Sequence, residues 1–200
     1  MVKLYSISVI FKAPSKVNIL KAANDVTEFG FFQRSSVAEF LKFTTQICAE
    51  RTQINQRQSV KEQNYMCHVY ITEERLGAVV ITDHDYPRRV VFNLMSKLCE
   101  DFKSKVPIRD CSGAPSVPIQ YEELPNWLAK YQDPKQADAM LRVQNELDET
   151  KIILHDTMES LLQRGEKLDD LVTKSDNLSM QSKMFYKQAK KTNSWCCAIQ

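Results

Sequence analysis

The end of the chain carries thiols placed for covalent lipid attachment. Its last four residues, Cys-Ala-Ile-Gln, fit the C-a-a-X pattern, and a terminal glutamine is typical of farnesylation, here of Cys197. Cys196 stands beside it, where a palmitoyl thioester can form and be removed. The stretch after Asp176 contains no acid and four lysines: Lys183, Lys187, Lys190 and Lys191. Because one lipid chain binds a membrane only marginally, the motif predicts an anchor that acylation of Cys196 switches between cytosol and membrane.

Arg164 offers a different chemistry, that of a many-donor side chain inside an apolar interface. Alternating steps of three and four residues from Arg164 define a seam that runs from Met140 to Thr192. The apolar seam residues are Met140, Val143, Leu147, Leu154, Leu161, Leu168, Leu171, Leu178, Phe185 and Ala189. A seam sustained this long predicts a coiled-coil helix of roughly 80 Å at about 1.5 Å per residue.

A homodimer is the simplest coiled coil, but the arginine argues against it. Two facing copies of Arg164 would bury like charges, at a cost of several kcal/mol. Small residues such as Ser175 and Ser182 would also pack poorly against themselves. The seam therefore predicts assembly with other chains that supply neutral acceptors opposite the guanidinium group.

No catalytic or metal site emerges from the remaining reactive residues. Cys67 and His68 are neighbours on an expected strand, so their side chains point to opposite faces and cannot share a proton. His84, between two aspartates, indicates a polar turn, and no further ligands are spaced to join it. Neither glycine-rich nucleotide motif is present. We therefore expect no catalytic residue, no metal, no nucleotide and no cofactor other than covalent lipid.

The composition is that of one ordinary domain with an extension. The chain has 200 residues, 43% of them hydrophobic, and a formal net charge of +2, which does not indicate a nucleic-acid partner. It contains no apolar run near the roughly 20 residues of a membrane-spanning helix. The first residues lack a signal-peptide cleavage site and suit a strand. We therefore expect a cytosolic protein with reduced cysteines, of which Cys48, Cys67 and Cys99 are core residues.

The N-terminal region alternates between strand and helix patterns. "LYSISVIF" and "KVNILKA" predict a hairpin, and "NYMCHVYIT" and "LGAVVIT" predict two further strands. Ser36 and Glu39 have capping-box spacing and are expected to begin a helix. A second helix after Pro87 presents Val91, Leu94, Met95, Leu98 and Phe102 on one face. It should end before Pro107, and "YEELPNWLAKY" suits a short last helix.

These elements indicate an α+β fold, an antiparallel sheet covered by helices as an α-β-α sandwich, followed by a long coiled-coil helix. We expect the folded domain over residues 1–131 and a linker with the helix start over 132–139, where Asp133 and Pro134 suit an N-cap and first turn. The coiled-coil motif then covers 140–192 and the lipidated tail 193–200.

The stretch from "VQNELDETKIILHD" to "MFYKQAKK" resembles the R-SNARE motif of the synaptobrevin group, and "FGFFQRSSVAEFLKF" with "HVYITEERLGAVVITDHDYPRR" resembles a longin domain. With the C-terminus, nearly the whole chain is similar to the lipid-anchored, Ykt-type subgroup. The resemblance implies a four-helix bundle in which Arg164 meets glutamines from three Q-SNARE helices, flanked by layers with Leu161, Leu168 and Leu171. It implies vesicle fusion in endoplasmic reticulum–Golgi, Golgi and endosomal traffic, with the protein in the cytosol and on the cytoplasmic faces of those membranes.

The resemblance also implies that the longin domain folds back on its own SNARE segment and shields the lipid in an apolar groove. Phe43, beside the apolar stripe of the first helix, either touches that segment or completes the core. Two alternatives to fusion stay open: a prenylated longin adaptor that only tethers, and an S-acyltransferase acting through the longin domain, for which the sequence offers no catalytic constellation.

Two serines of the seam are candidate phosphorylation switches. Ser175 and Ser182 occupy core layers, where a phosphate would bring close to two negative charges into the bundle. We expect phosphorylation there to block assembly and to disturb any fold-back that uses the same face.

Overall fold

The computed structural model describes the chain except for residues 1, 63, 112–118, 142–150 and 192–200. The N-terminal elements are β1 (Leu4–Lys12), β2 (Val17–Asn24), α1 (Arg34–Arg51), β3 (Gln56–Glu62), β4 (Tyr65–Ile71), β5 (Leu76–Asp83), α2 (Arg88–Lys105), a 3-10 turn η1 (Ile108–Cys111), α3 (Leu124–Lys130) and α4 (Pro134–Leu141). The C-terminal elements are β6 (Ile152–His155), α5 (Met158–Leu161), α6 (Leu168–Lys174) and α7 (Met180–Lys191).

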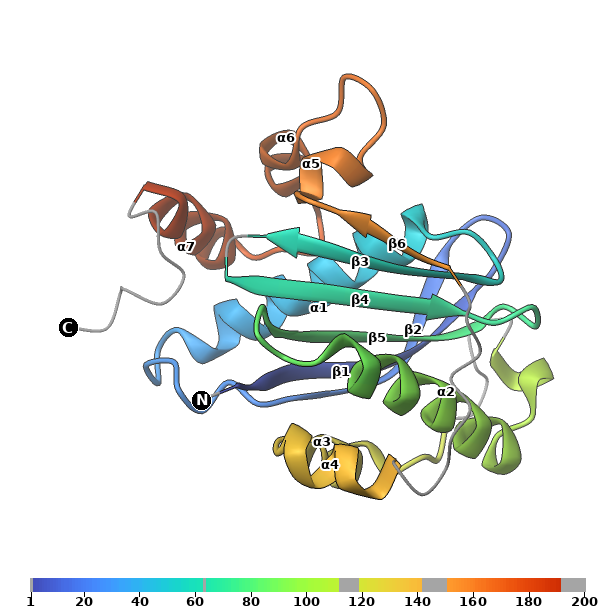
Figure 1. Cartoon of the computed structure of the whole chain (residues 1–200). Coiled ribbons are helices and arrows are strands. Elements are labelled where there is room, and N and C mark those ends of the chain that lie inside the picture. Colours follow the sequence, from blue (N-terminus) through green and yellow to red (C-terminus); the bar gives the residue numbers. More distant parts are fainter. Residues whose placement is uncertain (1, 63, 112–118, 142–150, 192–200) are drawn as a thin grey trace.

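The strands form one sheet in the order β2-β1-β5-β4-β3-β6. Neighbours pair antiparallel except β6, which lies parallel to β3 with Ser59 opposite Leu154. Helices α2, α3 and α4 cover the front face in Figure 1, and α1 crosses the back. The expected α-β-α sandwich is confirmed, with the addition of a parallel edge strand from the C-terminal region.

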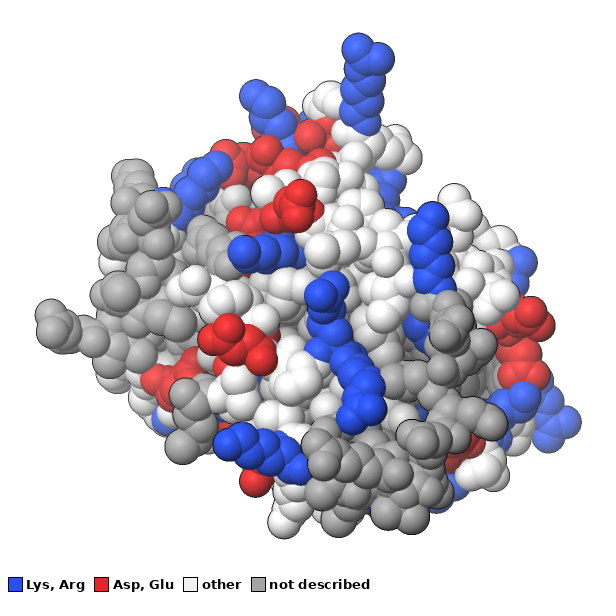
Figure 2. All heavy atoms as spheres, in the orientation of Figure 1, with Lys and Arg blue, Asp and Glu red and all other residues white. Residues whose placement is uncertain are grey.

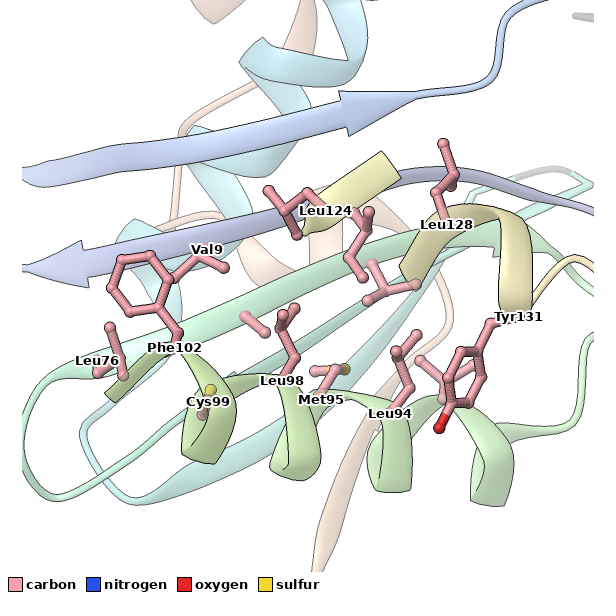
Figure 3. Close-up of a cluster of buried hydrophobic side chains, with 14 of the residues drawn as sticks. Val9, Leu76, Leu94, Met95, Leu98, Cys99, Phe102, Leu124, Leu128 and Tyr131 are labelled. Carbon is pink, nitrogen blue, oxygen red and sulfur yellow. The ribbon is translucent and has the colours of Figure 1, made fainter. Parts of the chain in front are cut away.

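The front layer is held by the apolar face of α2. Its buried residues recur every three or four positions, so the predicted stripe is the one that meets the sheet. Figure 3 shows Leu94, Met95, Leu98 and Phe102 of α2 pointing toward β1, β5 and α3. Burying such a side chain stabilises the fold by about 1.5–3 kcal/mol. The helix ends at Lys105, as expected from Pro107.

In the N-terminal domain one strand was not predicted, and the start of one helix was predicted wrongly. Strand β3, "QRQSVKE", was not predicted because its polar residues conceal a strand whose central residues are buried. Helix α1 begins at Arg34, not at a box opened by Ser36, and its N-cap Gln33 makes no side-chain cap bond. Ser36 is buried inside the helix, and Glu39 binds a different segment, described below.

The surface carries charges of both signs. On the face shown in Figure 2, Lys and Arg are interspersed with Asp and Glu over the described residues. This mixture agrees with the small net charge and is unlike the single-sign basic surface typical of nucleic-acid binding.

A buried histidine should make stability depend on pH. His68 is fully buried, with Nδ1 2.8 Å from the Ser59 hydroxyl, and burial, followed by the nearby Arg88 charge, lowers its pKa from 6.5 to about 3. Since the unfolded chain then binds more protons, stability is lost as pH falls from 6.5 toward 3. We expect the free energy of unfolding to drop by about 2 kcal/mol between pH 7 and 5 from this group.

Urea unfolding at a series of pH values measures this dependence. His84→Gln, a change at an exposed turn, serves as the matched control and should retain the slope. A free energy of unfolding that stays level from pH 7 to pH 5 would show that His68 does not stay neutral in the fold.

Candidate functional site

The heptad segment does not form one continuous helix in this structure. After residue 150 it supplies β6 to the sheet edge and then places the short helices α5, α6 and α7 over the α1 side of the domain (Figure 1). The continuous helix expected over residues 140–192 is therefore absent from this conformation over the described residues, while α4 starts at Pro134, capped by Asp133 as predicted. An unpartnered helix would leave its apolar stripe in water, and the sheet offers that stripe a place for burial.

The fold-back buries many of the apolar seam residues together with some neighbours outside the seam. Of the seam, Leu161, Leu168, Leu178 and Ala189 are buried, and Leu171 and Phe185 are partly buried against the same cluster. Met158, Val172 and Tyr186 are buried beside them although they are not seam residues. Leu154, in the edge strand, stays half exposed. Several side chains that the sequence assigns to a bundle core are thus packed against the domain in this conformation.

Arg164 is exposed and lies in a turn between α5 and α6. Gly165 follows with φ at +90°, in the region that favours glycine, and the Glu166 amide donates to the Gln163 carbonyl at 2.9 Å. The Glu166 carboxylate accepts from the Gln163 amide at 2.9 Å. The residues expected at the centre of the bundle are therefore held out of a helix in this conformation.

An ion pair fastens this turn to the domain. The Arg51 Nη2 group, at the end of α1, donates to both carboxylate oxygens of Glu166 at 3.0 and 2.8 Å. Both side chains are partly exposed, so the pair contributes only about 1 kcal/mol. Its role is to fix the place of the turn more than to stabilise the fold.

Helix α7 is held to α1 by a carboxylate and a ring stack. One oxygen of Glu39 accepts from the Ser182 hydroxyl at 2.6 Å and from the Ser179 amide at 2.9 Å. These bonds, the Ser182 bond first, hold the pKa of the Glu39 carboxyl below its usual range. The Phe40 ring stacks on Tyr186 at 5.3 Å between centroids. Glu39 thus caps α7 rather than its own helix.

Phe43 lies in the buried cluster that joins α1 to the folded-back residues. Its ring is 5.7 Å from that of Phe40, which in turn stacks on Tyr186. Phe43 therefore completes the core and supports the contact with α7 through Phe40. Of the two serine candidates, Ser182 is fully buried, whereas Ser175 is a partly exposed C-cap of α6 whose hydroxyl accepts from the Asn177 amide.

A cavity of about 210 Å³ opens between α1, the sheet and the folded-back helices. Its lining is mostly apolar and comes from both parts of the chain: Phe40, Leu41, Val60, Cys67, Ile81, Met158, Leu168 and Tyr186 among others. Beside it, the Cys48 thiol lies 3.6 Å from the Met158 sulfur. The tail cysteines Cys196 and Cys197 lie outside the described residues. A cavity of this chemistry suits a hydrocarbon chain.

The other reactive residues are structural. Cys67 faces this cavity while His68 packs against Phe92 on the opposite side of the sheet, as the strand alternation predicted. Over the described residues, no group of three or more His, Cys, Asp or Glu side chains is arranged to hold a metal ion. None of the described helices is both long and apolar enough to span a bilayer.

Strand β6 and the capping role of Glu39 were not predicted from the sequence. The β-branched pair Ile152 and Ile153 in "KIILH" was a signal for the strand, but the heptad repeat favoured a helix there. No local signal could have linked Glu39 to Ser182, because 143 residues separate them.

The comparisons with known proteins agree with this architecture. Residues 26–128 match the Longin family, described as a Regulated-SNARE-like domain, and residues 139–198 match the Synaptobrevin family. The sheet and helices together with these matches define an R-SNARE that carries a longin domain, and a synaptobrevin SNARE domain implies SNARE partners.

Relatives of nearly the same length identify the family within this class of R-SNAREs. The synaptobrevin homolog ykt6 of Schizosaccharomyces pombe is 52% identical over 98% of this chain and 99% of its own length. The homologs YKT6 of Eremothecium gossypii and Saccharomyces cerevisiae are 50% and 46% identical, with the same coverage. The chain belongs to the Ykt6 family of synaptobrevin homologues.

Proposed function

We propose that the chain docks and fuses transport vesicles by contributing one helix to a four-helix bundle with three Q-SNARE helices. The fold-back is the observation that carries this proposal. It buries Leu161 and Leu168 of the seam while leaving Arg164 exposed, which suits a segment stored until partners arrive. Five guanidinium donors are satisfied by neutral amide acceptors of three glutamines, without a counter-charge.

The membrane anchor in this proposal is lipid. Farnesyl on Cys197 and reversible palmitoyl on Cys196, assisted by the lysines after Asp176, would hold the tail at the bilayer. While the closed chain, in which the SNARE segment is folded back, is in the cytosol, the cavity between α1 and the folded-back helices would receive part of the lipid, because its lining is mostly apolar. Release of the SNARE segment would remove Met158, Leu168 and Tyr186 from the cavity wall, so a lipid in the membrane would no longer have a cavity to return to.

We place this activity in traffic between endoplasmic reticulum and Golgi, within the Golgi and to endosomes. This assignment rests on the family resemblance. The protein would move between the cytosol and the cytoplasmic faces of those membranes as Cys196 gains and loses its acyl chain.

Arg164→Leu tests the bundle. In a bundle the change leaves three glutamine amides without their shared donor, at a cost of about 1–3 kcal/mol, so the complex with Q-SNARE helices should melt several degrees lower. Lys174→Leu, which also removes one exposed positive charge but lies outside the seam, is the control. A tether without a central polar layer would instead tolerate Arg164→Leu or gain stability from it, which can be read from circular dichroism melts.

A further inference from the structure

The most exposed large hydrophobic side chains lie in two places, one loop and one helix. Among the described residues they are Phe32 at 85%, Phe31 and Met180 at 77% and Met184 at 65% exposed. The two phenylalanines lie in the loop before α1, and the two methionines lie on α7. No other large hydrophobic side chain in the described part of the chain exceeds 50%.

The loop that carries the phenylalanines is well organised. Arg34 donates from Nε to the Phe29 carbonyl at 3.1 Å and from Nη2 to the Thr27 carbonyl at 3.0 Å. Phe29 is buried, and its ring packs near that of Tyr5. Phe31 and Phe32 are therefore presented by a fixed turn, edge to face at 5.6 Å, rather than exposed by a loose loop.

On α7 the exposed methionines lie on the face away from the domain. Met180, Met184 and Lys187 follow at spacings of four and three, whereas Ser182, Tyr186 and Ala189 face the domain. Met180 and Met184 are not seam residues. Neither the fold-back nor a bundle core would bury these two methionines, so the outer face of α7 is free for another contact.

Both elements lie at one end of the molecule. The loop leads directly into α1, and the Glu39 bonds to Ser179 and Ser182 tie the start of α7 to the first half of the same helix. Figure 1 shows the loop before α1 and helix α7 on the same side of the molecule, at the left of the view.

We propose that Phe31, Phe32, Met180 and Met184 form a surface that inserts shallowly into a lipid bilayer while the SNARE segment is still folded back. This proposal rests on the lipid anchor proposed above. Cys197 is six residues beyond the end of α7, so its lipid, once it has left the cavity for a bilayer, holds that bilayer within about 20 Å of the helix. Because one lipid chain binds only marginally, a second contact is needed, and aromatic and apolar side chains supply it at a membrane interface.

The charges beside this surface fit a membrane with anionic lipids. Lys183 and Lys187 belong to α7, and Lys187 shares the outer face with the methionines. The acids near the loop, Asp25 and Glu28, both lie within 4 Å of the Lys3 ammonium group, at 3.6 and 3.4 Å, which offsets their repulsion of the headgroups. The closed chain would thus bind a membrane reversibly before its SNARE segment is released.

Flotation of the farnesylated full chain with phosphatidylcholine vesicles containing phosphatidylserine tests this surface. Phe31→Ser with Phe32→Ser should lower the partition constant about tenfold, corresponding to about 1.4 kcal/mol, and Met180→Ser with Met184→Ser should lower it by about threefold. Ile54→Ser changes an exposed apolar residue just beyond the opposite end of α1 and should leave binding unaltered. An unchanged melting temperature verifies the fold of each variant.

Cys197→Ser separates this inference from the anchor. If the phenylalanine variant floats like the wild type while Cys197→Ser does not float, the surface is refuted and the anchor stands. If Cys197→Ser floats like the wild type but the phenylalanine variant does not, the surface stands and the anchor is refuted. An equal loss of vesicle binding in the phenylalanine and Ile54 variants would also contradict the proposed surface. Any exposed apolar residue would then contribute to binding, wherever it lies.

Discussion

Gly165→Ala should shift the equilibrium between the closed chain and the helix of a bundle toward the helix by about 2–3 kcal/mol, roughly thirty- to 150-fold. Two effects act in the same direction. The closed turn holds residue 165 at φ +90°, which costs an alanine on the order of 1–2 kcal/mol. In the helix that a bundle requires, alanine is better than glycine by about 1 kcal/mol. If release of the segment limits assembly, the rate of helix gain with Q-SNARE helices should rise in proportion to the open population.

Gly30→Ala is the matched control. Gly30 lacks a positive φ, and an added Cβ would meet only the Gln33 side chain at an ordinary 3.5 Å. Its assembly rate should stay within about twofold of the wild type, corresponding to less than about 0.5 kcal/mol. Should Gly165→Ala assemble no faster than Gly30→Ala, the turn beside Arg164 does not limit opening.

Ser182→Glu should detach α7 from the domain. Ser182 is fully buried and donates to Glu39, so a second carboxylate there faces the first. We expect a cost on the order of 2 kcal/mol after screening at the partly exposed Glu39. Hydrogen exchange of the α7 amides should then speed up by roughly thirtyfold, as phosphorylation of Ser182 would also cause.

The second substitution Glu39→Lys should restore much of the protection, because it replaces the repulsion with an ion pair. Ser175→Glu, at the partly exposed end of α6, should cost less than about 1 kcal/mol in the closed chain. Equal exchange of α7 in wild type and Ser182→Glu would argue against Glu39 as the contact that holds this helix.

The same seam residues are packed on the domain in the closed chain and would be needed in the core of a bundle. In the closed chain the seam supplies Leu161, Leu168 and Leu178 to the α1 side of the sheet, and a bundle would need the same residues. If the proposed bundle forms, the domain would compete for these residues with the Q-SNARE helices, and the strength of this competition would depend on contacts that a bundle lacks. Those contacts are the Arg51–Glu166 pair, the Glu39 bonds and the strand pairing of β6 with β3.

Local patterns were sufficient for much of the longin domain. The face of α2 could be predicted because burial imposes a spacing of three and four residues, and Pro107 marked its end. The heptad repeat identified part of the buried set of residues 152–191, since Leu161 and Leu168 are apolar in either environment, but it did not identify Met158, Val172 or Tyr186. Arg164 was singled out as a charge within an apolar seam, and the turn that it forms with Gly165 was not predicted.

The remaining features depend on tertiary contacts. Strand β3 is polar because Gln58 hydrogen-bonds to the hydroxyl of Thr52, the C-cap residue of α1, and Ser59 hydrogen-bonds to His68. No periodicity in the sequence reveals either contact. The breaks between α5, α6 and α7 fall at residues 162–167 and 175–179, between helices that each pack on the domain. A repeat in the sequence specifies which residues are apolar and leaves open what they pack against.

Hydrogen exchange of the full chain, alone and with three Q-SNARE helices, tests most directly whether one segment alternates between the domain and a bundle. We predict that residues 162–167 and 175–179, which connect the short helices in the closed chain, become protected as helix on mixing. At the same time the amides of β3 that pair with β6 should lose protection. A complex that forms while the connecting residues stay unprotected and β3 stays protected would contradict this account.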